Sequence, residues 1–330
     1  YYYFPLSVIA FLSPCGIVER DDYKKVRMMA LDYSLLDVFA GAPFQGTQVP
    51  VVTLDAANSS DASKTAIAGE FQQTETVFIE PGNSASPVTV FNSKGRQLFG
   101  AHTILAASYV AYEMGMTKDE GEFASFLLKQ NEQWIESFID KGDSRSPGAI
   151  QFARVLTPTI DRYTPEIPRL AAALNIDEKH ISFSKYKPMV VSVDKPTLIV
   201  PFTKPEHVLA ASLNADRWSD LFGGVYTSEL FLFAPGSITG FTEFHGRLLN
   251  PSLPRDAFPP IGAVMPEFIA YLAEQGETAP GTHTLSVDRG SHETRKSILH
   301  AEFDKRPGKE VRCRIGGNVI KMGVGSLLYS

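Results

Sequence analysis

Three titratable side chains that are far apart in the chain are of the types that could move a proton: Glu75, His102 and Asp256. Glu75 lies in the segment QQTETVF, and the other two lie in loops that precede apolar helices. A carboxylate held in an apolar cleft can take and return a proton near neutral pH, and a neighbouring imidazole can orient the substrate or exchange a proton with it. These residue types fit proton abstraction from a carbon next to a carbonyl or carboxyl group.

Each of these residues also has a purely structural interpretation. His102 near a helix start could cap that helix or bond a carbonyl, and Glu75 could lie on the surface or in a hairpin. Asp256 could form an Asx-turn in its loop. Only the convergence of all three in one cleft distinguishes the catalytic interpretation from these alternatives.

Two helices must position these groups. The segments 103–114 and 261–275 are rich in small and apolar residues on every face, which predicts helices buried inside a domain. The start of a helix presents unpaired N–H groups and about half a positive charge. Two such ends facing one cleft would bind a carboxylate or stabilise an enolate. That chemistry needs no metal and no cofactor, and we expect neither.

Other catalytic patterns are missing from the sequence. The histidines show no H-x-x-x-H or H-E-x-x-H spacing, so no metal site is predicted. There is no phosphate-binding G-x-x-x-x-G-K-[ST] motif, no dinucleotide-binding motif and no G-x-S-x-G elbow. The two cysteines, Cys15 and Cys313, exclude a disulfide framework and favour a reducing cytoplasm.

Length and composition describe a globular protein of about two domains. The chain has 330 residues, of which 44% are hydrophobic and 21% charged, and its formal net charge is −6. Such a balance does not suit nucleic acid, and no apolar run approaches the roughly 18 residues of a membrane span. A small anionic metabolite is the expected partner.

The domain boundaries are predicted from the loops that contain Pro and Gly and from the similarity of two halves of the chain. Residues 1–28 are interpreted as an N-terminal appendage: an upstream extension, a short targeting segment or a tail, with a true first strand as the alternative. Residues 29–158 and 159–330 are two similar halves, each with several strands around one apolar helix. The closing strands are expected to pack back on the first half. Residues 118–148 are predicted to be an irregular excursion with one amphipathic stretch over 126–138.

The ordered segments resemble the PhzF-like family of phenazine-biosynthesis isomerases, which shares the diaminopimelate-epimerase fold. The resemblance runs from about Asp32 to Tyr329. It is carried by six segments in the family's order: LDVFAGAPFQGTQVPVV, AIAGEFQQTETVFI, LFGAHTILAASYV, RLLNPSLPRDAFPPIGAVMPEFIAYL, DRG with the following Arg295 and Ser297, and RCRIGGNVIKMGVGSLL.

This resemblance implies an α+β fold of two pseudo-symmetric domains. Each domain is a curled, mostly antiparallel sheet around a central helix, and the site lies between them. The family's acid/base glutamate falls on Glu75, its histidine on His102 and its aspartate on Asp256, and family members often form homodimers. Related racemases carry a cysteine at each helix loop, and neither loop has one here, which disfavours cysteine-based racemisation.

The substrate-binding positions depart from the family pattern. The glycine before the histidine is Ala101, and the Glu-Asp-Pro-Ala-Thr-Gly-Ser loop has become RDAFPPIG, with Arg255 beside the aspartate. Proline has no N–H, so part of the expected anion cradle is lost, and Arg255 could replace it with a bidentate contact. The expected substrate-binding residues are Gly100, Ala101, Thr103, Arg255, Ile261 and Gly262.

Three functions follow from this pattern. The first is a cofactor-free isomerase that acts on a small carboxylated metabolite. The second is a PhzF-like protein that binds a ligand or partner without chemistry, which the Pro-Pro-Ile replacement favours. The third keeps the fold and catalyses a cyclisation or lyase step.

Overall fold

The computed structural model describes residues 29–54, 60–81, 88–130, 133–142, 147–161, 164–222, 229–238, 240, 242–250, 253, 258–275, 278–291 and 294–329. The expected appendage, residues 1–28, therefore lies outside the described residues. Arg255 and Asp256 do so as well.

Two sheets account for most of the described residues. The first has six strands, in the spatial order β18 (Val319–Tyr329), β1 (Met29–Val38), β2 (Thr47–Thr53), β3 (Thr76–Ile79), β4 (Val88–Asn92) and β5 (Gly95–Gln97). The second has twelve strands, in the order β10 (Thr159–Asp161), β11 (Met189–Ser192), β12 (Pro196–Pro201), β13 (Glu229–Pro235), β14 (Phe244–Leu249), β15 (Gly281–Arg289), β16 (Ser297–Lys305), β17 (Val311–Gly317), β9 (Ile150–Leu156), β8 (Gln133–Asp140), β7 (Phe123–Gln130) and β6 (Lys118–Glu120). The pairs β2–β3, β12–β13 and β14–β15 are parallel, and the other pairs are antiparallel.

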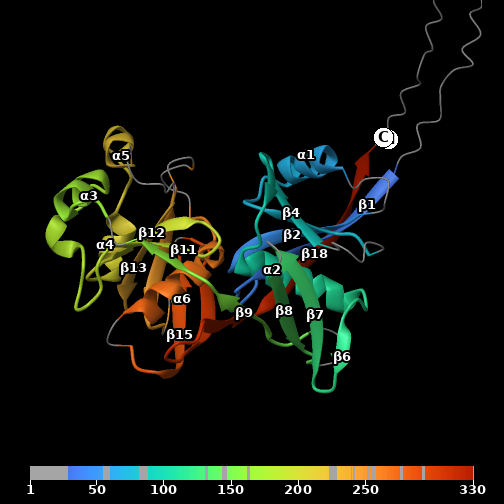
Figure 1. Cartoon of the computed structure of the whole chain (residues 1–330). Helices are drawn as coiled ribbons and strands as arrows, with labels where there is room; N and C mark the ends of the chain where they lie inside the picture. Colours follow the sequence, from blue (N-terminus) through green and yellow to red (C-terminus); the bar gives the residue numbers. More distant parts are fainter. Residues whose placement is uncertain are drawn as a thin grey trace, which may run out of the picture.

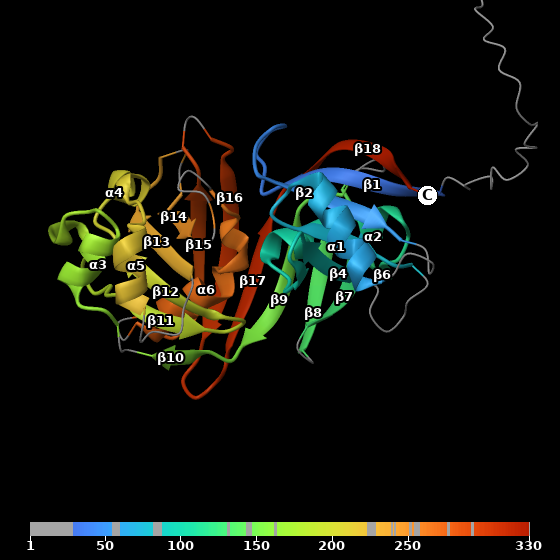
Figure 2. The same cartoon turned by 90° about the horizontal axis from the view of Figure 1, so that it is seen from above.

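Helices fill and cover these sheets. They are α1 (Asp61–Phe71), α2 (Ala101–Glu113), α3 (Ile167–Ala173), α4 (Pro205–Ala210), α5 (Ala215–Phe222) and α6 (Met265–Glu274), with the 3₁₀ turns η2 (Glu178–His180) and η3 (Ile261–Ala263). Figures 1 and 2 show two lobes, one around α2 and one around α6. The expected α+β fold of two domains, each a sheet curled around an apolar helix, is confirmed.

The two central helices are buried for most of their length. Residues 101–111 of α2 and 265–273 of α6 are buried. Helix α2 contacts strands of both sheets, whereas α6 contacts β11, β12, β16 and β17. A helix that is apolar all round needs packing on every side, and the curled sheets provide it.

The last two strands join the lobes. Strand β17 pairs with β9 in the twelve-stranded sheet, and the next strand, β18, pairs with β1 in the other sheet. In Figures 1 and 2 this red segment crosses from the lobe of α6 to the lobe of α2. The start of α2 and the start of α6 are thus held in one framework.

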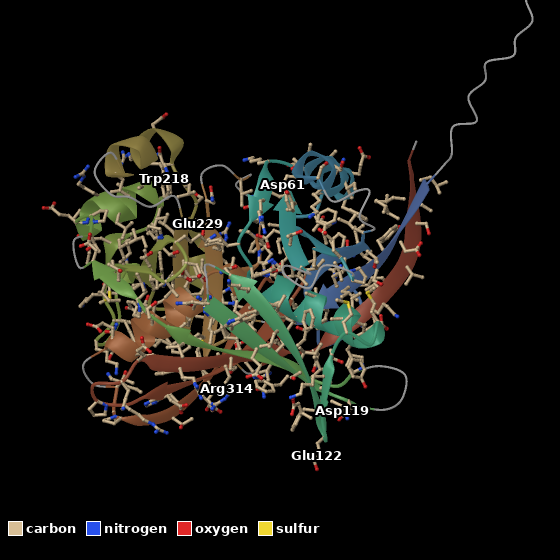
Figure 3. The ribbon with its side chains drawn as sticks, turned by 45° about the vertical axis from the view of Figure 1, so that its right-hand side comes forward. Asp61, Asp119, Glu122, Trp218, Glu229 and Arg314 are labelled. Carbon is tan, nitrogen blue, oxygen red and sulfur yellow. The ribbon has the colours of Figure 1, made fainter. Side chains whose placement is uncertain are left out.

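Strands β12 and β13 of the C-terminal lobe are covered on both faces. Phe231 and Phe233 of β13 pack in the core around α6, whereas Leu230 and Leu232 between them pack in a second cluster with residues of α3 and α4. Figure 3 shows Trp218 of α5 at the outer side of this second layer. Because successive strand residues point to opposite faces, one strand serves both layers.

Two sequence predictions about secondary structure were wrong. Residues 118–148 contain the antiparallel strands β6, β7 and β8 instead of an irregular excursion. In β8, Ile135 and Ile139 are buried whereas Trp134 and Glu136 are exposed, which is the period of a half-buried strand. Figure 3 shows Asp119 and Glu122 at the tip of the hairpin that β6 and β7 form.

The second apolar helix is also shorter than predicted. Residues 261–263 form a 3₁₀ turn, and α6 begins at Met265. Pro266 follows at the second helical position and has no N–H, so it cannot donate the hydrogen bond to Gly262 that a helix starting at Ile261 would need. The helix therefore starts at Met265, directly before the proline, rather than at the apolar run's first residue.

Candidate active site

The N-terminus of α2 is fixed by its own residues. Gly100 is the N-cap residue of α2 and has an extended backbone, with φ −91° and ψ 163°. The Thr103 hydroxyl accepts a hydrogen bond from the Gly100 N–H at 3.0 Å and donates one to the Gly100 carbonyl at 2.9 Å. Thr103 was expected to bind substrate, and the structure places its hydroxyl in this cap.

His102 and Glu75 meet at this helix start. The His102 Nε2 lies 2.6 Å from the Glu75 Oε2, although the residues are 27 positions apart. Glu75 comes directly before β3, which pairs with β2 and places it beside α2. A carboxylate and an imidazole at this distance share a hydrogen bond through which a proton can be held.

The two side chains differ in their access to solvent. His102 has 1% of its side chain exposed, whereas Glu75 has 14%. A small molecule can therefore reach the Glu75 carboxyl more readily than the imidazole. In this arrangement Glu75 is the group that could touch a substrate, and His102 stands behind it.

The start of the second helix lies against the same histidine. A β-carbon at Gly262 would lie 3.1 Å from the His102 backbone nitrogen and 3.2 Å from its Nδ1. A β-carbon at Gly100 would lie 2.6 Å from the His102 Cε1 and 3.2 Å from the Cα of Ala263. A β-carbon at Gly100 would force the imidazole to move, and one at Gly262 would make a tight contact with it, so η3 and the start of α2 meet around the imidazole. The buried His102 Nδ1 has no hydrogen-bond partner among the described residues.

The Phe39 ring packs against the place where η3 and the start of α2 meet. Its ring would lie 3.2 Å from a β-carbon at Gly262 and 2.6 Å from one at Gly317. Its backbone bonds the other half twice, because its N–H donates to the Asn318 carbonyl at 2.8 Å and its carbonyl accepts from the Ile298 N–H at 3.1 Å. Phe39 has a φ of 61°, which is strained for a bulky residue and is held by these contacts.

Most of the predicted site residues therefore converge. Glu75, His102, Gly100, Ala101 and Gly262 come together at the two helix starts. Ile261 is buried in η3 beside them. Arg255 and Asp256 lie outside the described residues, so the third member of the expected trio has no position here.

Sequence reasoning missed Phe39 as a part of the junction. It also gave no role to Phe258, Arg247 and Arg289, which lie around the start of η3. Phe39 follows an alternating strand and looks like its last core residue. The positive φ that turns its ring toward Gly262 has no local signal in the sequence.

Cys313 is not a second acid or base. It lies on β17 with no side-chain exposure, and burial raises the pKa of its thiol to about 12. A thiol in that state is not a nucleophile near neutral pH. Within the described segments, no group of three or more His, Cys, Asp or Glu side chains is arranged to hold a metal ion.

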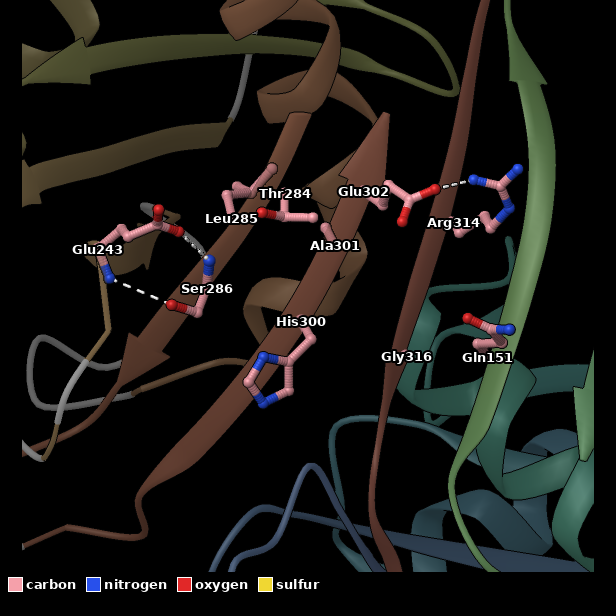
Figure 4. A pocket seen from close by; sticks show the side chains of 10 residues that line it. All are labelled: Gln151, Glu243, Thr284, Leu285, Ser286, His300, Ala301, Glu302, Arg314 and Gly316. Atoms are coloured by element: carbon pink, nitrogen blue, oxygen red, sulfur yellow. Dashed lines mark hydrogen bonds and ion pairs between the residues drawn. The ribbon is translucent and has the colours of Figure 1, made fainter. Parts of the chain in front are cut away.

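A hollow on the sheet surface is separate from this junction. It has a volume of about 330 Å³ and lies over β15, β16, β17 and β9 (Figure 4). Its polar groups bond one another: the Glu243 N–H donates to the Ser286 hydroxyl, the Ser286 N–H donates to the Glu243 carboxylate, and Arg314 pairs with Glu302. Neither Glu75 nor His102 lines it.

None of the helices in the described ranges is long and apolar enough to cross a bilayer.

The fold is similar to solved structures described as phenazine biosynthesis proteins and as epimerases. A phenazine biosynthesis PhzF-family protein from Bacillus anthracis superimposes with a TM-score of 0.74 at 14% identity, over 91% of this chain and 100% of that one. A protein described as a predicted epimerase from Pseudomonas aeruginosa gives 0.68 at 23% identity, over 91% and 99%. A hydroxyproline epimerase from Agrobacterium vitis gives 0.59 at 9% identity, over 91% and 92%.

Sequence comparison agrees with the fold. An uncharacterized isomerase of Mesorhizobium japonicum is 23% identical over 307 residues, which cover 91% of this chain and 99% of the relative. The family model for phenazine biosynthesis-like proteins, PhzC-PhzF, matches residues 36–323, a span that includes both helix starts and the Glu75–His102 pair. This chain belongs to the PhzC-PhzF family.

Proposed function

We propose that this chain is an isomerase that moves a proton between carbon atoms of a small carboxylated metabolite without a cofactor. The observation that carries the proposal is the 2.6 Å contact between Glu75 and His102 at the meeting point of two helix starts. The Mesorhizobium japonicum relative, described as an isomerase, and the epimerase-like fold of the structural neighbours support the same reaction class.

Glu75 is the base in this proposal. Its carboxylate removes a proton from the carbon next to the substrate carboxyl, and the electron pair of that C–H bond moves into an enolate. The protonated Glu75 then returns the proton to a different face or a different carbon. One proton leaves the substrate and one proton returns, so the reaction has no net change in composition and needs no redox partner; while it is held on the Glu75 carboxyl, this proton can exchange with solvent.

His102 orients the base. Its Nε2–H donates to the Glu75 Oε2 and keeps the other carboxyl oxygen free to face a substrate. With Nε2 protonated, the unpartnered Nδ1 is a buried acceptor directed at Gly262 and Gly100. The N–H groups of Thr103 and Ile104 donate to the Gly100 carbonyl. The N–H groups of Ala101 and His102, which precede them, are the ones that would stabilise the negative charge of the enolate.

A deuterium-exchange assay tests this function. The protein is incubated in D₂O with a set of small carboxylic acids that have a C–H next to the carboxyl, and deuterium incorporation is followed by mass spectrometry. We expect exchange with the wild type and its loss in Glu75→Gln, because the amide cannot take the proton. Glu70→Gln changes an exposed glutamate of α1 and is the matched control. Unchanged exchange in Glu75→Gln would refute the mechanism.

The second candidate is a protein that binds the same anions without chemistry. The Pro259–Pro260 pair favours it, because neither residue offers an N–H before η3. In that case Glu75→Gln would bind the acids as the wild type does, and neither protein would exchange deuterium. The homodimer and the cytoplasmic location stay predictions.

A further inference from the structure

Phe258 is held between two buried arginines. The Arg247 guanidinium carbon lies 4.7 Å from the centre of the Phe258 ring, and the Arg289 Nη1 donates a hydrogen bond to the Phe258 carbonyl. Arg247 is 4% exposed and Arg289 is 5% exposed. The ring and the backbone of one residue are thus fixed by separate cationic groups.

Both guanidinium groups are themselves anchored to the fold. Arg247 donates to the carbonyls of Leu209 and Ala211 at the end of α4, each at 2.9 Å. Arg289 donates to the Ser297 hydroxyl at 3.1 Å, and Ser297 is 1% exposed. Phe258 is therefore attached both to the outer helix layer and to the start of β16.

Burying the charge of Arg289 costs free energy that the packing of a neutral side chain would not cost. Its acceptors among the described residues are a carbonyl and a hydroxyl, with no carboxylate. Burial lowers the pKa of Arg289 to about 10. A buried cation without a carboxylate partner lowers stability, so its effect is best sought in what it positions.

A stiff segment connects Phe258 to the histidine. Pro259 and Pro260 follow directly, and proline rings fix φ; Pro260 has φ −61° and is the N-cap of η3. Gly262 comes two residues later and lies against His102. Two consecutive prolines transmit a displacement of Phe258 to Gly262 instead of absorbing it in the backbone.

We propose that Arg247, Arg289 and Phe258 are positioning residues that act through Pro259–Pro260 to hold Gly262 against the His102 imidazole. The prolines then have a structural use in the site. This inference concerns the geometry at His102, and its importance for turnover rests on the proposed function above.

Histidine NMR tests the link without a substrate. The full chain is labelled with ¹³C at the ring Cε1 of its seven histidines, and the His102 signal is assigned with His102→Gln. Arg289→Met removes the hydrogen bonds from Arg289 to the Phe258 carbonyl and to the Ser297 hydroxyl. We expect the His102 signal to move by more than its linewidth. Arg289→Lys restores a cationic donor and is expected to restore most of the position.

Two internal comparisons separate positioning from general damage. The signal of His283, which stacks on Phe303 in another part of the lobe, is expected to stay in place. Arg314→Met changes an arginine of β17 that pairs with Glu302 and is expected to leave His102 unchanged. A folded Arg289→Met protein with an unmoved His102 signal would overturn the proposal.

A variant outside the arginines keeps the test decisive if Arg289→Met does not fold. Pro259→Gly leaves the contacts of Arg247 and Arg289 with Phe258 in place and makes the segment between Phe258 and Gly262 less stiff. We expect a shifted or broadened His102 signal in this variant, and an unchanged signal would also overturn the proposal. The readout needs neither substrate nor turnover, so loss of the proposed isomerase activity and loss of the positioning are observed separately.

Discussion

Replacing the buried carboxylate of Glu267 is expected to reverse a pH-dependent loss of stability. Glu267 lies in the first turn of α6 and has no exposed surface. Its Oε1 accepts hydrogen bonds from the backbone N–H groups of Val193, Asp194 and Lys195 at 3.3, 2.9 and 3.2 Å. Burial outweighs these bonds and raises the pKa of Glu267 from 4.5 to about 7.

The sign and size follow from linkage between protonation and folding. The folded protein binds this proton more tightly than the unfolded chain does, so the stabilisation is complete below the unfolded pKa of 4.5 and is lost as the pH rises to about 7. The gap between those two values corresponds to roughly 3 kcal/mol. Glu267→Gln keeps an acceptor oxygen and does not ionise, so it escapes this loss.

Urea unfolding, followed by circular dichroism between pH 5 and pH 8, measures the effect. We expect Glu267→Gln to exceed the wild type in stability by up to about 3 kcal/mol at pH 8, with a smaller difference at pH 5. Glu274→Gln changes an exposed glutamate at the end of the same helix and is the control. A variant that is less stable than the wild type at pH 8, or a difference independent of pH, would refute the reasoning.

The remaining predictions concern the glycine contact and an ion pair between the halves. Gly262→Ala places a methyl group 3.1 to 3.2 Å from atoms of the site's histidine, and we expect deuterium exchange to fall on the order of 100-fold; an unchanged rate in the D₂O assay would argue against the close contact. Arg295→Met leaves the fully buried Asp37 without its guanidinium and is expected to lower the free energy of unfolding by roughly 3 kcal/mol. Arg314→Met, at a pair with about a third of each side chain exposed, should cost at most about 1 kcal/mol, and equal losses in urea unfolding would contradict this.

The sequence determined the fold class and the presence of the first central helix, with a start two residues from the observed one. Apolar residues on every face of the segment 103–114 require a buried helix, and α2 covers nearly that range. The ordered segments predicted the family, and the resemblance assigned roles to Glu75 and His102, which their residue types and places in the chain had already made candidates. Local residue chemistry and motif order are properties of the chain itself, so they can be read before folding.

Where local patterns were ambiguous, the structure decided. The apolar positions of 126–138 fit more than one regular element, and pairing of β7 with β8 selected strands. The start of α6 depended on the proline at its second position, which limits the turn before it. The first correction is an outcome of pairing between neighbouring segments, and the second is a local effect of one proline.

Only the tertiary structure decided which buried surfaces meet. Periodicity tells which face of a helix or strand leaves water, and it does not tell which other face covers it. The contact of Gly262 with His102, the positive φ of Phe39 and the hold of Arg289 on Phe258 join segments that are far apart in the chain. The contact of Gly262 with His102 is made only when both lobes are in place, and Arg289 meets Phe258 only when the C-terminal lobe has folded, because each contact depends on how distant segments pack.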